Sequence, residues 1–90
     1  MAYKVTLSRQ AEKFLDRLLV GDRNSALDIH RALKELAENP RPIGSQKLEG
    51  SKNSYRIKVK VYRVLYRIDG DRIVVEVFKI GHRREVYRGL

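Results

Sequence analysis

The spacing of apolar residues changes once along this 90-residue chain, and the change limits the folds that it can adopt. Between residues 8 and 38, apolar side chains recur at intervals of three and four, as in helices with one buried face. Between residues 55 and 80, they recur at every second position, as in strands. A helical half followed by consecutive strands is typical of an α+β domain.

Two helices are expected in the first half. Ser8 can cap the first helix, and either Asp22 or Ser25 can cap the second, because each has a side-chain oxygen that accepts from a free backbone N–H. The second helix ends near residues 39–42, since the two prolines there cannot continue the hydrogen-bond ladder. The two helices form an antiparallel hairpin. The first has a continuous apolar stripe: Ala11, Phe14, Leu15, Leu18 and Leu19.

Four strands are expected, one before the helices and three consecutive antiparallel strands after them. In the last strand, both the odd-numbered and the even-numbered positions are mostly apolar, so alternation does not decide which side faces the core. A strand that is apolar on both faces is typical of the interior of a sheet, and we expect this strand to be central. Residues 43–53 are predicted to be a loop that anchors Leu48 in the core. The expected strands are residues 3–7, 55–59, 62–68 and 73–80.

These elements predict a single α+β domain covering residues 1–90, with the order β-α-α-β-β-β. The helical hairpin packs on a curved, mainly antiparallel sheet. No segment approaches the ~18 apolar residues that a membrane span needs, and the first residues do not resemble a signal peptide, so a cytoplasmic location is expected. The chain has no cysteine, which excludes a disulfide scaffold, a zinc-thiolate site and a thiol nucleophile.

The positive charge is concentrated in the second half of the chain. The net charge is +9, and residues 52–90 hold eleven basic and four acidic side chains, a net +7. Such a field attracts polyanions, and nucleic acid is the first partner to consider. Arg56 and Lys58 alternate with apolar residues, so one face of their strand is cationic, and Arg63 and Arg67 extend this face on the next strand.

This cationic face has a possible chemical use. Guanidinium groups bind phosphate oxygens through paired donors and stabilise the charge of a pentavalent transition state, without a need for a metal. In RNA the 2'-hydroxyl is an internal nucleophile, and a ring such as that of Tyr87 can stack on a displaced base. The plain alternative is that alternating Arg and Lys keep an exposed strand soluble and protect a sheet edge.

The element order and four segments resemble the RelE branch of the RelE/ParE toxin superfamily over essentially the whole chain. The resemblance implies the toxin of a toxin-antitoxin pair, which enters the ribosomal A site and cleaves bound mRNA. The implied mechanism is metal-independent and has no cofactor: the 2'-hydroxyl attacks the scissile phosphate. The segments are Leu48-Glu49-Gly50, Tyr55-Arg56-Ile57-Lys58-Val59, Tyr62-Arg63-Val64-Leu65-Tyr66-Arg67-Ile68 and Gly81-His82-Arg83-Arg84-Glu85-Val86-Tyr87.

The resemblance also implies site residues and partners. Its catalytic positions fall on Lys58, Arg63, Arg83 and Tyr87. Arg63 and Arg83 would hold the phosphate, with Arg83 also a proton donor to the leaving 5'-oxygen. Lys58 or Tyr87 would assist removal of the 2'-proton. The implied partners are a RelB-type antitoxin in a hetero-oligomer, the ribosome and mRNA, with no membrane. The expected RNA-binding residues are Arg56, Lys60, Arg67, His82 and Arg84.

One turn departs from the family pattern. Relatives commonly have a Gly-Asp or Gly-Asn type turn before the Tyr-Arg pair, where this chain has Lys60-Val61. Valine disfavours positive φ, so either the turn type or the strand register is altered, and the alignment of Lys58 with Arg63 stays open. Two alternatives also stay open: a non-enzymatic inhibitor of DNA gyrase, as in the ParE branch, and a catalytically inactive relative that only binds antitoxin or RNA.

Overall fold

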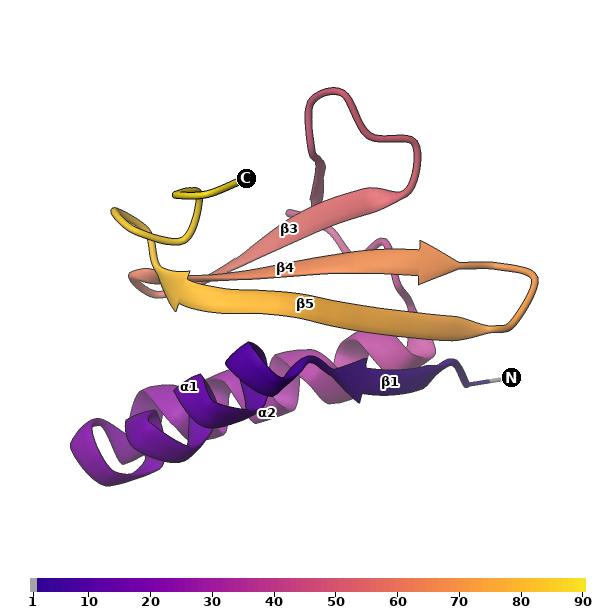
Figure 1. Cartoon of the computed structure of the whole chain (residues 1–90). Coiled ribbons are helices and arrows are strands. Elements are labelled where there is room, and N and C mark those ends of the chain that lie inside the picture. The colour runs from indigo at the N-terminus through magenta and orange to yellow at the C-terminus, as the bar shows by residue number, and fades with distance from the viewer. Residues whose placement is uncertain (1) are drawn as a thin grey trace.

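Two helices cover one face of a five-stranded sheet in the computed structural model, which describes residues 2–90 (Figure 1). The sheet order is β1-β5-β4-β3-β2, and β1 pairs with β5 in parallel while all other pairs are antiparallel. The α+β architecture is confirmed, and β5 is an interior strand. The elements are β1 Lys4–Leu7, α1 Arg9–Gly21, α2 Arg23–Glu38, β2 Gln46–Lys47, β3 Ser54–Val59, β4 Tyr62–Asp69 and β5 Val74–His82.

Both helices begin at side-chain caps. The hydroxyl of Ser8 accepts from the Ala11 N–H at 3.1 Å, as the sequence predicts. Asp22, not Ser25, caps α2: its carboxylate accepts from the Ser25 N–H at 3.2 Å and from the Ser25 hydroxyl at 2.6 Å. Asp22 takes this role because α1 ends at Gly21, which leaves only Asp22 between the helices. Neither helix has the length and apolar composition of a membrane span.

The core lies between the helices and the inner face of the sheet. Each large side chain buried here contributes roughly 1.5–3 kcal/mol of hydrophobic stabilisation. Tyr66 is fully buried and its hydroxyl donates to the Pro40 carbonyl at 2.6 Å, and burial raises the pKa of this phenol to about 12. The main contributors from the helices and strands are Leu15, Ile29, Leu36, Val64, Tyr66, Val75, Val77 and Ile80.

A β-bulge in β5 explains why the alternation of this strand is ambiguous. The pairing of β4 with β5 shifts between Leu65 and Tyr66, which leaves Phe78 as an extra residue in β5. An extra residue moves every later side chain to the opposite face. The core positions of β5 are therefore odd-numbered before the bulge and even-numbered after it: Val75, Val77 and Ile80.

Side chains at the start of α1 form hydrogen bonds with the backbone of β5, at positions that lie past the end of its pairing with β1. The Ser8 hydroxyl donates to the Phe78 carbonyl at 2.9 Å. The Gln10 amide donates to the Ile80 carbonyl at 2.8 Å and accepts from the Ile80 N–H at 3.0 Å, as a paired strand would. These contacts satisfy backbone groups that the short β1 does not reach.

Two predictions for the segment 43–53 are wrong. It contains the two-residue strand β2, which pairs with β3 through Gln46 opposite Arg56. Leu48 is half-buried and lies outside the main core; it lines a cavity with Phe78 on the other face of the sheet. The bulge turns Phe78 outward, so that face of the sheet carries an apolar residue that lines the same cavity as Leu48.

Candidate nucleic-acid interface

Three paired positions cross the outer face of the sheet, the face away from the helices. Lys58 of β3 is directly opposite Arg63 of β4, and Arg63 is directly opposite Gly81 of β5. Lys60 and Val61 form a two-residue turn with a φ of 56° at Lys60 only. The left-handed backbone therefore falls on the lysine, and the strand register is kept. The alignment of Lys58 with Arg63, which the sequence left open, holds in the structure.

The turn orients Arg63. One terminal nitrogen of its guanidinium, Nη1, donates to the Lys60 carbonyl at 3.1 Å and to the Tyr62 carbonyl at 2.9 Å. Both bonds use the same nitrogen, and a guanidinium has five N–H donors, so its other two nitrogens remain available to an anion. Lys58 is exposed and Arg63 is half-buried beside it. Two cations side by side in this way repel each other, and an anion bound between them removes that repulsion.

The C-terminal segment, residues 83–90, folds back over the outer face (Figure 1). The backbone N–H of Arg83 donates to the Val61 carbonyl at 2.7 Å, which fixes the start of the segment to the β3–β4 turn. Val86 is buried and packs on Gly81, where a Cβ would lie 3.3 Å from the Val86 Cβ. Arg83 and Arg84 are exposed beside this contact. Gly81 therefore lies within β5 and makes room for the returning chain.

A cavity of about 410 Å³ lies between this segment and the loop after β2. Tyr87, 43% exposed, lines it together with Phe78, and the Arg67 guanidinium lies 5.3 Å from the centre of the Phe78 ring. A largely apolar cavity lined by two aromatic rings suits a planar base. The other lining residues are Leu48, Glu49, Gly50, Ser51, Ser54 and Leu90.

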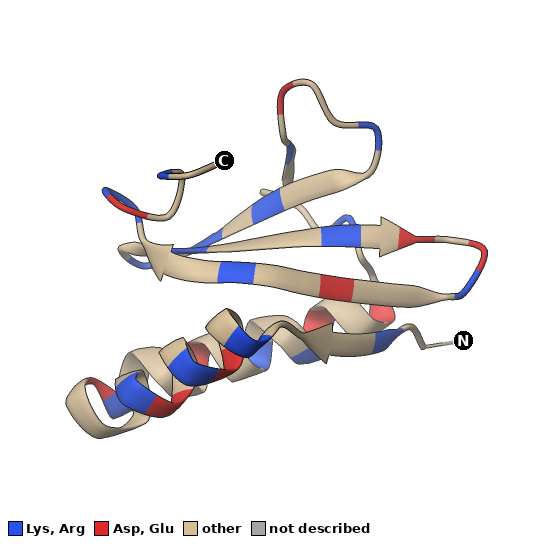
Figure 2. Cartoon of the chain, in the orientation of Figure 1, with Lys and Arg blue, Asp and Glu red and all other residues tan. Residues whose placement is uncertain are grey.

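The predicted site residues do not all lie at one place on the outer face of the sheet. Figure 2 shows basic residues along β3, β4 and the C-terminal segment, with acidic and basic residues mixed on the helices. Lys58 and Arg63 lie at the hairpin end of the outer face, where the Arg83 backbone is attached, and Tyr87 lies further along in the cavity. Arg67 is four residues from Arg63 on β4 and forms a loose ion pair with Glu76, 4.0 Å between Nε and Oε1.

Arg56 is half-buried on β3. Its Nη2 donates to the Gln46 side chain of β2, and its buried Nη1 has no hydrogen-bond partner in the described chain. A buried guanidinium nitrogen without a partner is costly. The predicted role of Arg56 in binding RNA stays a prediction.

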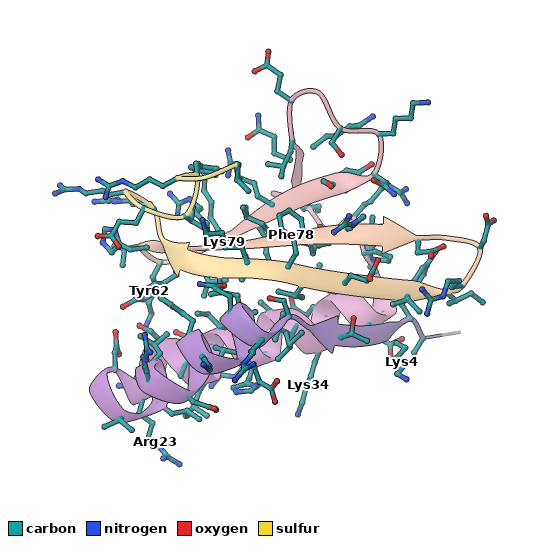
Figure 3. The ribbon with its side chains drawn as sticks, in the orientation of Figure 1. Lys4, Arg23, Lys34, Tyr62, Phe78 and Lys79 are labelled. Atoms are coloured by element: carbon teal, nitrogen blue, oxygen red, sulfur yellow. The ribbon has the colours of Figure 1, made fainter. Side chains whose placement is uncertain are left out.

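Two other predicted contacts have different surroundings. His82 is paired with Tyr62, on the helix side of the sheet, and their ring centroids lie 6.1 Å apart; Figure 3 labels Tyr62 on that side, across the sheet from Phe78. The His82 Nδ1 accepts from the Arg84 N–H at 3.2 Å. Lys60 extends toward α2, with its Nζ 2.9 Å from the Asp28 carboxylate. This hydrogen bond raises the pKa of Lys60 and lowers the pKa of Asp28.

Sequence reasoning missed two features of this surface. Phe78 faces outward only because of the bulge, and the signal for it was the failure of either parity to account for β5. Asp28 lies on a helix far from the sheet residues in sequence, so no local pattern connects it with Lys60. Among residues 2–90, no three His, Asp or Glu side chains gather as a metal-binding group.

Comparisons with known proteins identify the family of this chain. Residues 5–87 match the family model of the ParE toxin of the type II toxin-antitoxin system parDE. Toxin RelG of Mycobacterium tuberculosis is 27% identical over 88 residues, which cover 98% of this chain and 99% of that protein.

Solved structures share the fold over nearly the full chain. The crystal structure of the archaeal RelE-RelB complex from Pyrococcus horikoshii matches with a TM-score of 0.80 and 25% identity, covering 96% of this chain and 100% of that one. The intact E. coli RelBE toxin-antitoxin complex matches with a TM-score of 0.77 and 28% identity, covering 90% and 96%. This chain therefore belongs to the ParE toxin family of the RelE/ParE superfamily and is a toxin of a type II toxin-antitoxin system.

Proposed function

We propose that this toxin is a ribosome-dependent endonuclease that cleaves mRNA in the A site and so inhibits translation. The observation that carries the proposal is the row Lys58–Arg63–Gly81 with the Arg83 backbone fixed beside it. Lys58 and Arg63 present two neighbouring cationic side chains on the outer face, and the exposed Arg83 begins the segment that is fixed to the turn beside them. An inhibitor that works only by protein contact does not need such an arrangement.

The proposed reaction is an internal transesterification. The RNA 2'-oxygen attacks the adjacent phosphorus as its proton is removed, and the bond to the 5'-oxygen breaks as that oxygen gains a proton. The products are a 2',3'-cyclic phosphate and a free 5'-hydroxyl. Arg63 and Arg83 stabilise the charge on the phosphorane oxygens, and Arg83 also donates the proton to the 5'-oxygen. Lys58 or Tyr87 assists removal of the 2'-proton.

Tyr87 has a second proposed role, which is to hold a base. The reaction requires the 2'-oxygen, the phosphorus and the 5'-oxygen to lie in line, and a base rotated out of its stack favours this geometry. Tyr87 and Phe78 line the cavity further along the outer face, and the Arg67 guanidinium lies 5.3 Å from the centre of the Phe78 ring. Stacking in this cavity would hold a base of the bound RNA.

The proposed partners are a RelB-type antitoxin, the ribosome and mRNA, all in the cytoplasm. The similar structures from Pyrococcus horikoshii and E. coli are complexes of RelE with RelB. A protein of charge +9 suits an acidic antitoxin segment that covers its basic surface, and it suits ribosomal RNA for the same reason.

Primer extension on mRNA in a reconstituted translation system tests the proposal. We expect cuts only on ribosome-bound mRNA, unchanged by a chelator, and lost in the Arg63→Ala variant. Arg23→Ala is the matched control, because Arg23 lies at the exposed start of α2 on the helix side. Cuts in ribosome-free RNA would indicate a ribosome-independent nuclease. No cuts with folded protein would refute nuclease activity.

Inhibition of DNA gyrase is the second candidate, and the match to the ParE family model favours it. A supercoiling assay with purified gyrase separates the two functions. Under this alternative, the toxin blocks supercoiling and Arg63→Ala has no effect, since protein contact needs no phosphate-binding arginine. Under the nuclease proposal, supercoiling proceeds normally at toxin concentrations that cleave ribosome-bound mRNA.

A further inference from the structure

The β3–β4 turn carries a lysine where the backbone favours glycine. Lys60 has a φ of 56°, and the only other non-glycine residue of positive φ in the described chain is Ile73. L-residues are disfavoured in this region because Cβ approaches the following carbonyl oxygen, whereas glycine adopts it freely. A side chain kept at such a position requires contacts that offset the backbone cost.

The Lys60 side chain has such contacts on α2. Its Nζ lies 2.9 Å from Asp28 Oδ2 and 3.5 Å from the hydroxyl of the buried Ser25. Ser25 is in turn bonded to Asp22, the N-cap of α2. The turn is therefore attached to the first two turns of a helix that packs on the opposite face of the sheet. An ion pair that joins two elements in this way fixes their relative position even where its contribution to stability is modest.

The backbone of the same turn holds the two candidate arginines. The Lys60 carbonyl accepts from the Arg63 guanidinium at 3.1 Å, and the Val61 carbonyl accepts from the Arg83 N–H at 2.7 Å. Movement of the turn therefore moves both groups. We propose that Asp28 and Lys60 are positioning residues, whose ion pair fixes the β3–β4 turn and through it the placement of Arg63 and Arg83. The inference rests on the nuclease function proposed above.

The competing interpretation is that Lys60 binds an RNA phosphate directly, as the sequence predicts. The two roles differ in the effect of Asp28→Asn. If Lys60 binds phosphate, removal of the carboxylate frees the ammonium and strengthens RNA binding. If the pair positions the turn, the same substitution slows cleavage and leaves ribosome binding unchanged, since no contact to RNA is lost.

Single-turnover cleavage at saturating ribosome concentration separates these outcomes. We expect Asp28→Asn and Lys60→Ala each to lower the cleavage rate about tenfold, because small misplacements of reacting groups have large effects on rate, with ribosome affinity within about twofold of wild type. The charge-swapped double variant Asp28→Lys with Lys60→Asp restores most of the rate. Arg31→Ala is the control, since Arg31 contacts the same carboxylate at 2.8 Å but not the turn. Wild-type cleavage by Asp28→Asn would overturn the proposal.

Hydrogen exchange of the Arg83 amide provides a test that does not depend on catalysis. This N–H is bonded to the turn, so we expect its exchange to be about tenfold faster in Asp28→Asn and Lys60→Ala, while core amides of β4 exchange as in wild type. Unchanged Arg83 exchange overturns the positioning role. A wild-type protein that cleaves no mRNA refutes the proposed function instead, and the exchange rates still decide whether the pair fixes the Arg83 backbone.

Discussion

Val86 packs directly on Gly81, and this contact brings the C-terminal segment back over the sheet. A Cβ at position 81 would lie 3.3 Å from the Val86 Cβ and 3.4 Å from its Cα. The φ of Gly81 is not in the left-handed region, so alanine meets only this steric conflict. Gly81 is paired with Arg63, and the Arg83 N–H two residues later donates to the Val61 carbonyl. The position of the candidate site therefore depends on a residue without a side chain.

Gly81→Ala is expected to lower the free energy of unfolding by about 1–3 kcal/mol, because the added methyl group overpacks the contact with Val86. Val86→Ala also destabilises, since it leaves a cavity. The double variant should lose less unfolding free energy than the two single variants lose in sum, because the smaller side chain at position 86 makes room for the methyl group at position 81. Urea denaturation of all four proteins measures this coupling. Strict additivity would show that the two residues do not compete for the same space.

Arg83→Ala and Tyr87→Ala are expected to abolish growth arrest in cells without disturbing the fold. Both side chains are exposed, so their removal exposes no core, and the Arg83 backbone bond to Val61 is kept. Expression of each variant from an inducible promoter, with circular dichroism of the purified protein, checks this prediction. Full toxicity in both variants would remove the two side chains from the mechanism, whatever the substrate.

Gln10→Ala is expected to lower the free energy of unfolding by about 1–2 kcal/mol, because it leaves both the N–H and the carbonyl of Ile80 without their partner. Gln10→Glu should recover only part of this loss: a carboxylate accepts from the N–H but has no donor for the carbonyl. Thermal unfolding of the three proteins compares these effects. Wild-type stability in Gln10→Ala would mean that water replaces the amide at this edge.

Tyr66 is expected to ionise only in strongly alkaline solution, because burial raises its pKa to about 12. The folded-state pKa lies above the ordinary value of 10.0, so this contribution to stability is complete below pH 10 and is lost as the pH rises toward 12. Ultraviolet titration and urea denaturation between pH 7 and 12 measure both effects. Tyr66→Phe should flatten this pH dependence. It should also lose about 1 kcal/mol at neutral pH, since the Pro40 carbonyl loses its donor.

Local patterns determined most of the secondary structure. The helical stripes, the Ser8 cap and the prolines after α2 act within a few residues, so the sequence alone placed both helices and the long strands correctly. The alternation of Lys58 and Arg63 with apolar neighbours likewise placed these cations on the outer face. Each of these signals depends on neighbours along the chain, and no tertiary contact reverses them.

Tertiary contacts determined what alternation could not. Phe78 faces outward because the pairing of β4 with β5 shifts between Leu65 and Tyr66, and this bulge has no local signal apart from mixed parity. Leu48 lies outside the core and lines a cavity with Phe78, and Lys60 extends to Asp28 because α2 lies within reach of the turn. The sequence by itself determined which residues are cationic and which strands carry them. Only the packing of distant segments decided which of these cations share a site.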